Sequence, residues 1–400
     1  MKPKTIGGSA LFAQSHTDPH MGVNPSISDS STYSFKSAQH MSDTFIGETE
    51  GMYLYSRHSS PTNNALAASL AAMEGTQDAC VFGSGMGAIS AVLFQLCSAG
   101  DQVVSSQTIY GGSYALLKNF MPKFGIETRF VDFTNVEAVS QAIGPNTKVL
   151  YCETMSNPLL EITHIKAMSE LAEKHQLTLV VDNTFSPLIV APATQGAHIV
   201  IHSLTKFING TSDAIAGVVC ASNEFCASLK SVMDGAAMLF GSTLDAQRAA
   251  TILKNMKTLP IRMAKHSENA LYIAKHLEAA GYRVSYPGLE SHPGKKILEA
   301  QWVPEYGYGG LLTLDAGSSE KANALMEAMQ EEGLGYLAVS LGFYKTLFSA
   351  SASSTSSEIS EGEQKNMGLS SGLVRFSIGL DPNIADYTNR MLRCVHQIEL

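Results

Sequence analysis

The residues with the clearest chemical potential combine a carboxylate, an amine and two hydroxyls near the middle of the chain. Asp182 comes directly after the apolar run 177–181, and Lys206 follows the next apolar run together with Ser203 and Thr205. Both runs have the continuous apolar character of buried parallel strands, and ligands of open α/β sheets bind outside the carboxyl ends of such strands. We therefore expect these four side chains to meet at one edge of a sheet.

A glycine-rich segment is expected to bring an anion site to the same edge. The short apolar run 79–82 is followed by GSGMG (83–87) and then by the helix-like run 89–97. A strand, a glycine turn and a helix in this order direct free backbone N–H groups toward an anion. The segment lacks the lysine of a GxxxxGK[ST] loop, and no acidic residue ends a second strand about 20 residues later. These absences argue against a nucleotide site.

Pyridoxal 5'-phosphate needs this combination of groups. Its aldehyde requires a lysine amine, its phosphate requires hydroxyl and backbone N–H donors, and its ring nitrogen requires a carboxylate that keeps it protonated. A lysine held in an apolar, cationic site also has a pKa low enough to act as a base near neutral pH. The sequence therefore predicts that pyridoxal 5'-phosphate is the cofactor.

Residues 60–257 have the pattern of a sheet covered by helices on both faces, and we expect them to form the cofactor-binding domain. Only about a dozen residues separate the last two apolar runs, which is at the lower limit for a helical crossover, so the last strand should be antiparallel to its neighbour. The pattern predicts an α/β fold with a mainly parallel seven-stranded sheet. The expected strands are 79–82, 102–105, 127–131, 148–152, 177–181, 198–202 and 216–221.

The two ends of the chain have a different character. Residues 1–59 are rich in Ser, His, Asn and Pro with little periodicity, so they are either disordered or packed on something else, such as a partner subunit. Residues 258–400 combine a long helix with apolar runs at 309–314 and 372–378, and they predict a smaller α+β C-terminal domain. The Ser-rich stretch 349–360 is interpreted either as an exposed loop or, for 349–357, as part of the wall of the substrate channel.

Several motifs resemble the Cys/Met-metabolism family of pyridoxal-phosphate enzymes. The family has the aspartate aminotransferase type of fold, called fold type I of the PLP-dependent transferases. The motifs occur in the family's order and span about residues 20–380. They are YSRHSSPTNNAL (55–66), GSGMGAI (83–89), YGGSY (110–114), ETMSNP (153–158), VVDNTF (180–185), SLTKFINGTSD (203–213), KTLPIRMAKHSENA (257–270), YPGLESHP (286–293) and VSLG (339–342).

The resemblance assigns roles around the cofactor ring. It implies that Lys206 forms the Schiff base and that Asp182 is the partner of the ring nitrogen. Tyr110 is expected to stack on the ring, and Asn157 to lie near the ring hydroxyl. These four residues belong to four different motifs, so the fold has to bring them together.

The resemblance also assigns the phosphate ligands. Those from the same subunit are two backbone N–H groups and two hydroxyls, of Gly85, Met86, Ser203 and Thr205. Tyr55 and Arg57 resemble a YxR pair that reaches the phosphate of the neighbouring subunit. The resemblance therefore implies a homo-oligomer, expected to be a tetramer built from catalytic dimers.

Arg375 lies inside an apolar strand-like run, where an unpaired guanidinium would be costly. Its partner is either an internal carboxylate or the α-carboxylate of an amino acid substrate, which guanidinium groups bind in a bidentate manner. The resemblance favours the substrate, with Ser340 of the VSLG turn assisting.

The resemblance predicts a carbon–sulfur lyase that carries out α,γ-elimination on a sulfur amino acid, L-methionine or L-cystathionine. Lys206 would remove the Cα proton, and Lys206 and Tyr110 would act as catalytic base and acid in the later steps. Val339 resembles the methionine-cleaving members, whereas Gly112 follows the pattern of sulfhydrylases and cystathionine enzymes. The alternative is therefore γ-replacement by an O-acetyl- or O-succinylhomoserine sulfhydrylase or a cystathionine γ-synthase.

Composition excludes several other classes. The chain has 27 Lys and Arg against 36 Asp and Glu, a net charge of −9, which argues against nucleic acid as a partner. No apolar run reaches the length of a membrane span, and the N-terminus is a poor signal peptide. The six cysteines show no CxxC pair and no spacing of a metal site. We expect a cytoplasmic protein with reduced thiols and no bound metal.

Overall fold

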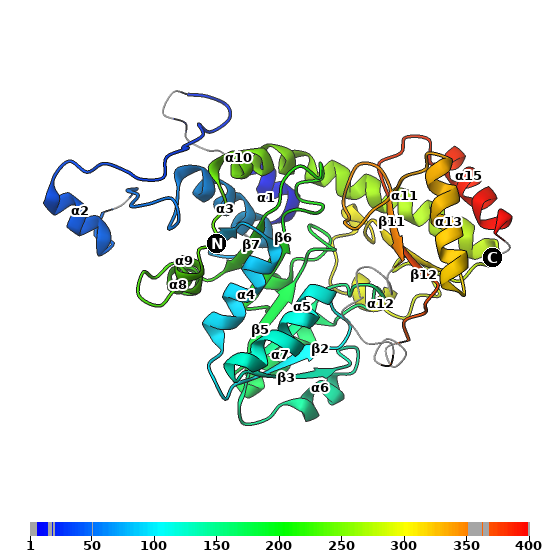
Figure 1. The fold of residues 1–400 in the computed structure, drawn as a ribbon, viewed down its shortest axis with the longest axis horizontal. Coiled ribbons are helices and arrows are strands. Elements are labelled where there is room, and N and C mark those ends of the chain that lie inside the picture. The colour runs from blue at the N-terminus through cyan, green and yellow to red at the C-terminus, as the bar shows by residue number, and fades with distance from the viewer. Residues whose placement is uncertain are drawn as a thin grey trace.

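The structure is a computed structural model that describes residues 6–14, 18, 21–49, 51–350, 362 and 368–398. Two sheets dominate it, a large one in the centre of Figure 1 and a smaller one beside it, where the C-terminal third of the chain lies. Within the described residues, no helix has both the length and the apolar composition that a membrane crossing requires.

The large sheet has seven strands in the order β1-β7-β6-β5-β4-β2-β3. All neighbouring pairs are parallel except those of β7, which runs antiparallel to both β1 and β6. These pairings confirm the predicted sheet and its antiparallel strand. Strand β7 is antiparallel because the short connection after β6 leaves no room for a helical crossover. The strands are β1 (Asp78–Phe82), β2 (Gln102–Ser106), β3 (Glu127–Val131), β4 (Thr147–Glu153), β5 (Thr178–Asp182), β6 (Ile199–Ser203) and β7 (Gly217–Ala221).

Helices cover both faces of this sheet. Along β5, Leu179 and Val181 pack into the core shared with α3, while Val180 packs into the core shared with α4. Burial on both faces explains why the strand sequences are continuously apolar. The helices of this part are α3 (Pro61–Glu74), α4 (Gly85–Leu96), α5 (Gly111–Ala115), α6 (Val136–Ala142), α7 (Ile165–His175), α8 (Asn223–Leu229), α9 (Ala236–Phe240) and α10 (Ala246–Asn255).

Local sequence explains where α3 and α4 begin and end. The hydroxyl of Ser60 accepts a hydrogen bond from the backbone N–H of Asn63 and caps α3, which ends at Gly75 with a φ of +78°. The hydroxyl of Ser84 accepts from the N–H of Gly87 at 2.9 Å and caps α4 in the same way. These caps fix the start of α4 at the edge of the sheet where β5 and β6 end.

The smaller sheet has five strands in the order β10-β11-β12-β9-β8, and only the β10–β11 pair is parallel. Ser349 and Ala350 are buried at the end of β11, so the interpretation of 349–360 as an exposed loop is wrong for these two residues; 351–360 lie outside the described residues. The elements are α11 (Leu259–Ala279), β8 (Val284–Ser285), α12 (Lys295–Glu299), β9 (Leu311–Asp315), α13 (Ser319–Glu331), β10 (Tyr336–Leu337), β11 (Leu347–Ala350), β12 (Leu373–Ser377) and α15 (Ile384–Gln397).

The N-terminal segment contains two short helices that its sequence pattern did not reveal, α1 (Gly7–Ala13) and α2 (Ala38–Phe45). α1 packs on α3 of its own chain and buries Ala10 and Leu11. α2 projects away from both sheets (Figure 1), and Phe45 at its end is exposed. The contact of residues 1–59 with a neighbouring subunit stays a prediction, as do the boundaries at 60 and 258.

Candidate active site

A cavity of about 400 Å³ lies at the carboxyl ends of β4, β5 and β6. Its other walls are the start of α4, the turn at 339–341 and the middle of β12. The structure therefore brings together ten of the predicted site residues, all of which line this cavity: Gly85, Met86, Tyr110, Asn157, Asp182, Ser203, Thr205, Lys206, Ser340 and Arg375.

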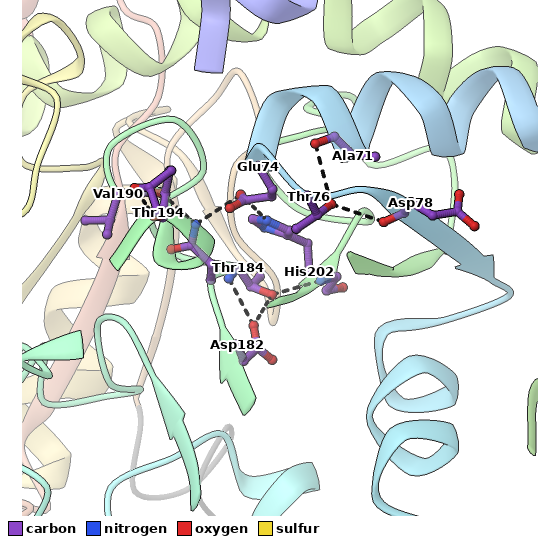
Figure 2. A network of polar contacts seen from close by, with 12 residues as sticks. Ala71, Glu74, Thr76, Asp78, Asp182, Thr184, Val190, Thr194 and His202 are labelled. Carbon is purple, nitrogen blue, oxygen red and sulfur yellow. Dashed lines mark hydrogen bonds and ion pairs between the residues drawn. The ribbon is translucent and has the colours of Figure 1, made fainter. Parts of the chain in front are cut away.

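Asp182 is the last residue of β5, and its side chain is held by the residue two positions later. Its Oδ1 accepts hydrogen bonds from Thr184 Oγ1 at 2.5 Å and from Thr184 N at 2.9 Å (Figure 2). Burial raises the pKa of Asp182, while the two bonds from Thr184 and the charge of His202 lower it. A cation beside this carboxyl group, such as a protonated ring nitrogen, would favour its ionised form.

Lys206 lies three residues beyond the end of β6, and its amine reaches the opposite wall of the cavity. Lys206 Nζ donates a hydrogen bond to Ser340 Oγ at 3.0 Å. Burial, together with the positive charge of Arg375, lowers the pKa of Lys206 to about 8. A much larger fraction of this amine is thus unprotonated near neutral pH than for an exposed lysine, so it can act as a nucleophile and as a base.

Arg375 is buried in the middle of β12 and makes hydrogen bonds only to neutral groups among the described residues. Its side chain donates to Asn157 Oδ1 at 2.9 Å and to Ser340 O at 3.2 Å, while Nε has no partner there. Burial lowers its pKa to about 10, opposed by Glu153 and Tyr110. The described residues provide no ion pair for this guanidinium, which leaves the internal salt bridge unsupported and fits the binding of an incoming carboxylate.

Ser340 links the two cationic side chains. It accepts from Lys206 through its hydroxyl and from Arg375 through its carbonyl. Its φ of +153° is a backbone conformation that residues with a side chain rarely adopt. The turn therefore holds a strained residue where the amine and the guanidinium meet, and such strain is often found at functional sites.

Glu153 is a site residue that the sequence reasoning did not single out, although it opens the motif 153–158. Its Oε1 accepts from Tyr110 N at 2.8 Å, and its Oε2 accepts from Asn157 N at 2.9 Å. Burial and the charge of Asp182 raise its pKa, while these two bonds and Arg375 lower it. The signal in the sequence was an acidic residue directly after an apolar run, the same arrangement as at Asp182.

Replacing Glu153 should show that it positions both neighbours. We expect Glu153→Ala to lower the free energy of unfolding by about 2–4 kcal/mol, because two buried N–H groups lose their acceptor. Glu153→Gln keeps one acceptor oxygen and should cost less stability, yet it should still lower kcat/KM about tenfold by displacing Tyr110 or Asn157. Urea unfolding and steady-state kinetics measure the two effects. An unchanged kcat/KM in Glu153→Gln would contradict the positioning role.

The start of α4 has the features expected of an anion site. The first N–H groups of a helix have no intrahelical partner, and those of Gly85 and Met86 lie at the cavity. A Cβ atom at position 85 would lie 2.9 Å from Ser203 Cβ, so only glycine allows this approach. The hydroxyl of Thr205 donates a hydrogen bond to the carbonyl oxygen of Ala216 at 3.3 Å and thus already has a partner within the chain. A bond from this hydroxyl to the phosphate stays a prediction.

Tyr55 and Arg57 are the two predicted site residues that lie outside this cavity. Both are exposed, and the Arg57 guanidinium lies 5.7 Å from the centre of the Tyr55 ring. Neither residue lines the cavity of its own chain. Their contribution to a neighbouring site stays a prediction.

The chemistry of these groups fits pyridoxal 5'-phosphate. Asp182 would hold the ring nitrogen, the Lys206 amine would bind the aldehyde carbon, and the start of α4 would hold the phosphate. The orphan Nε of Arg375, buried and without a partner among the described residues, remains for the carboxylate of an amino acid. Every polar part of the cofactor thus has a group of matching chemistry.

Comparison with known proteins supports the same assignment. The family of Cys/Met metabolism PLP-dependent enzymes matches residues 9–389. Methionine gamma-lyase of Arabidopsis thaliana is 44% identical over 366 residues, which cover 90% of this chain and 83% of the relative. L-methionine gamma-lyase of Fusobacterium nucleatum subsp. polymorphum is 38% identical over 386 residues, 95% of each chain.

A solved structure matches the fold. The crystal structure of a Campylobacter jejuni protein assigned as an O-acetylhomoserine (thiol)-lyase superposes with a TM-score of 0.90 at 27% identity, over 98% of this chain and all of the other. That structure contains N'-pyridoxyl-lysine-5'-monophosphate, a cofactor bound to a lysine. The chain therefore belongs to the Cys/Met metabolism family of enzymes, with their type I fold and with pyridoxal 5'-phosphate as its cofactor.

Proposed function

We propose that the enzyme is a carbon–sulfur lyase that cleaves L-methionine by α,γ-elimination into methanethiol, 2-oxobutanoate and ammonia, with L-cystathionine as a further substrate. The observation that carries the proposal is the similarity to methionine γ-lyases over 90% or more of the chain. The cavity supports it, because Ile215 and Val339 place apolar side chains on its wall, where they suit a methylthio group better than a charged one.

The side chains of the cavity divide the work of this reaction. When bound, pyridoxal 5'-phosphate would supply an acceptor for the electrons released at the substrate Cα. Lys206 takes the Cα proton, since its lowered pKa supplies free amine near neutral pH. Arg375 and Ser340 hold the substrate carboxylate and fix the Cα–H bond toward the amine. Lys206 also takes the Cβ proton whose removal α,γ-elimination requires, and Tyr110 gives a proton to the departing sulfur as the carbon–sulfur bond breaks.

The alternative is γ-replacement, in which a thiol adds where the lyase admits water. Gly112 is the residue that favours it, because Gly112 follows the pattern of sulfhydrylases. Product analysis decides between the two, with L-methionine, L-cystathionine, and O-acetyl- or O-succinylhomoserine plus sulfide assayed side by side. Methanethiol and 2-oxobutanoate from methionine support the lyase. Homocysteine from acylhomoserine, with methionine untouched, would move the enzyme to the replacement branch.

Gly112 also determines where the Tyr110 ring lies. A Cβ atom at position 112 would come within 2.5 Å of Tyr110 Cε1. Tyr110 is 42% exposed, so its ring can move away, and we expect Gly112→Ala to leave thermal stability nearly unchanged. Turnover should still fall about tenfold, because the proton donor is displaced. Methanethiol assays and thermal melts measure these effects.

The matched control for this variant is Gly144→Ala. A Cβ atom at position 144 meets Gln102 Oε1 at 3.7 Å, an ordinary contact away from the cavity. Equal kcat/KM in the two variants would show that crowding at Gly112 has no influence on the site.

We also propose that active sites form between subunits. Residues 1–59 act as an arm whose Tyr55 and Arg57 reach the phosphate of a neighbouring chain, and two catalytic dimers associate as a tetramer. Residues 60–257 bind the cofactor, and 258–400 form the C-terminal domain. The exposure of Arg57 and the projection of α2 away from the body of its own chain support this assembly.

A further inference from the structure

A buried carboxylate lies behind the cavity without lining it. Glu74 is the last residue of α3, and its Oε1 forms a 2.7 Å ion pair with His202 Nε2 and accepts a hydrogen bond from Asn183 Nδ2 at 3.3 Å (Figure 2). All three side chains are buried, with exposures of 0 to 1%. None of the three belongs to the wall of the cavity. Glu74 Oε1 thus links the end of α3 to the carboxyl ends of β5 and β6.

These contacts lead to Asp182 by a short path. Asn183 lies between Asp182 and Thr184 in the chain. His202 directly precedes Ser203, whose backbone N–H donates to Thr184 Oγ1 at 2.8 Å. Thr184 in turn donates to Asp182 Oδ1, as described above. The path therefore runs from Glu74 through both strand ends to the carboxyl group of Asp182, which would face the ring nitrogen of the bound cofactor.

Stability does not explain why this pair is present. A buried ion pair returns its desolvation cost only when the remaining polar atoms are also satisfied. Here Glu74 Oε2 and His202 Nδ1 have no hydrogen-bond partner among the described residues. Glu74 also lies at the carboxyl end of α3, where the helix dipole disfavours a negative charge. Apolar residues of similar size would stabilise the fold at least as well.

The charge of His202 acts on Asp182 in the direction that the cofactor needs. Burial raises the pKa of Asp182, and His202 is one of the groups that lower it. An Asp182 that is both ionised and held in one orientation can keep the ring nitrogen protonated. The 2.7 Å contact between Glu74 Oε1 and His202 Nε2 keeps the His202 ring in place beside the strand end.

We propose that Glu74 and His202 form a positioning pair, which holds the two strand ends so that Asp182 is directed at the ring nitrogen of pyridoxal 5'-phosphate. The inference rests on the proposed role of Asp182. It assigns no contact with substrate to either residue. The pair acts only through the strand ends.

Binding of two cofactors to the apoenzyme tests the proposal. One is pyridoxal 5'-phosphate, and the other is its 1-deaza analogue, in which CH replaces the ring nitrogen. We expect Glu74→Gln and His202→Gln to weaken binding of pyridoxal 5'-phosphate about tenfold or more and binding of the analogue less than about twofold. His292→Gln, at a buried histidine distant from Asp182 in the sequence, should leave the ratio of the two dissociation constants unchanged.

A structural role would give a different result. If the pair only supports the fold, both cofactors lose affinity equally, and the proposal is overturned. Glu74→Gln preserves shape and decides the question if His202→Gln does not fold. Asp182→Asn is measured in parallel: if it weakens binding of both cofactors by the same factor, the role of Asp182 itself is refuted. Adding His202→Gln to Asp182→Asn should produce no further loss of discrimination, because the pair acts through that carboxylate.

Discussion

Replacing Lys206 with alanine is expected to lower turnover of L-methionine at least about 10⁴-fold, because one side chain provides both the cofactor's anchor and the base. Lys206→Arg should be nearly as inactive, since a guanidinium does not lose its proton in proteins. Steady-state release of methanethiol measures both variants. Among the described residues, the Lys206 side chain makes one hydrogen bond, to Ser340, so thermal melts should show a folded protein. Activity of Lys206→Ala within tenfold of the wild type would remove it from the catalytic role.

The same lysine should give the apoenzyme a characteristic pH dependence. Its pKa is lowered from 10.5 to about 8, so the free amine dominates above pH 8 and the ammonium form dominates below it. The rate at which pyridoxal 5'-phosphate couples to the apoenzyme should therefore rise with pH and level off above about 8. A midpoint near 10.5 would show that burial and Arg375 do not act on this amine.

Mixed oligomers of two inactive variants test whether the proposed arm reaches the site of a neighbouring subunit. Lys206→Ala and Arg57→Ala should each be inactive or weakened alone, yet a mixed dimer contains one site with both residues intact. Random reassociation of equal amounts should recover about a quarter of wild-type activity for a two-fold symmetric pair. No recovery, with mixed dimers present by mass spectrometry, would place Arg57 in some other role.

Replacing Arg375 with alanine is the second large effect. We expect kcat/KM for L-methionine to fall about 10²–10³-fold, the cost of removing one partner of a buried, hydrogen-bonded charge pair. The cofactor should remain bound, because its predicted contacts are to Asp182, Lys206 and the start of α4. The visible absorption of the bound cofactor and steady-state kinetics separate the two effects.

Two further results bear on Arg375. Arg375→Lys keeps the charge but loses the planar fork, so it should recover only part of the lost kcat/KM. The wild-type guanidinium also bonds Asn157 and Ser340, and the alanine variant frees both groups. Loss of the cofactor in Arg375→Ala would mean that the residue holds the cofactor or the fold, and the substrate-binding role would then be wrong.

The sequence predicted the site residues whose positions are determined by a single strand and the loop that follows it. Asp182 and Lys206 each follow an apolar run, and parallel strands bring their carboxyl ends to one edge. The strand pattern likewise revealed the antiparallel β7. Glu153 follows the same pattern, and it was missed because its partners are backbone N–H groups of Tyr110 and Asn157, which no sequence pattern displays.

The remaining features depend on contacts between distant segments. Glu74 and His202 are 128 residues apart, and each looks unremarkable in its own segment. α1 lacks a long periodic pattern because only a few of its residues pack on α3. Ser349 was assigned to a low-complexity loop, yet it lies opposite Arg375 in the register of β11 and β12. Composition describes a segment in isolation and does not report such pairings.

The two sheets contribute different chemistry to one cavity. The large sheet and α4 provide Asp182, Lys206 and the anion site, whereas the small sheet and its turn provide Val339, Ser340 and Arg375. Substitutions in the turn can therefore alter substrate preference while the cofactor contacts persist. Directed evolution of this chain should accordingly begin at residues 338–343.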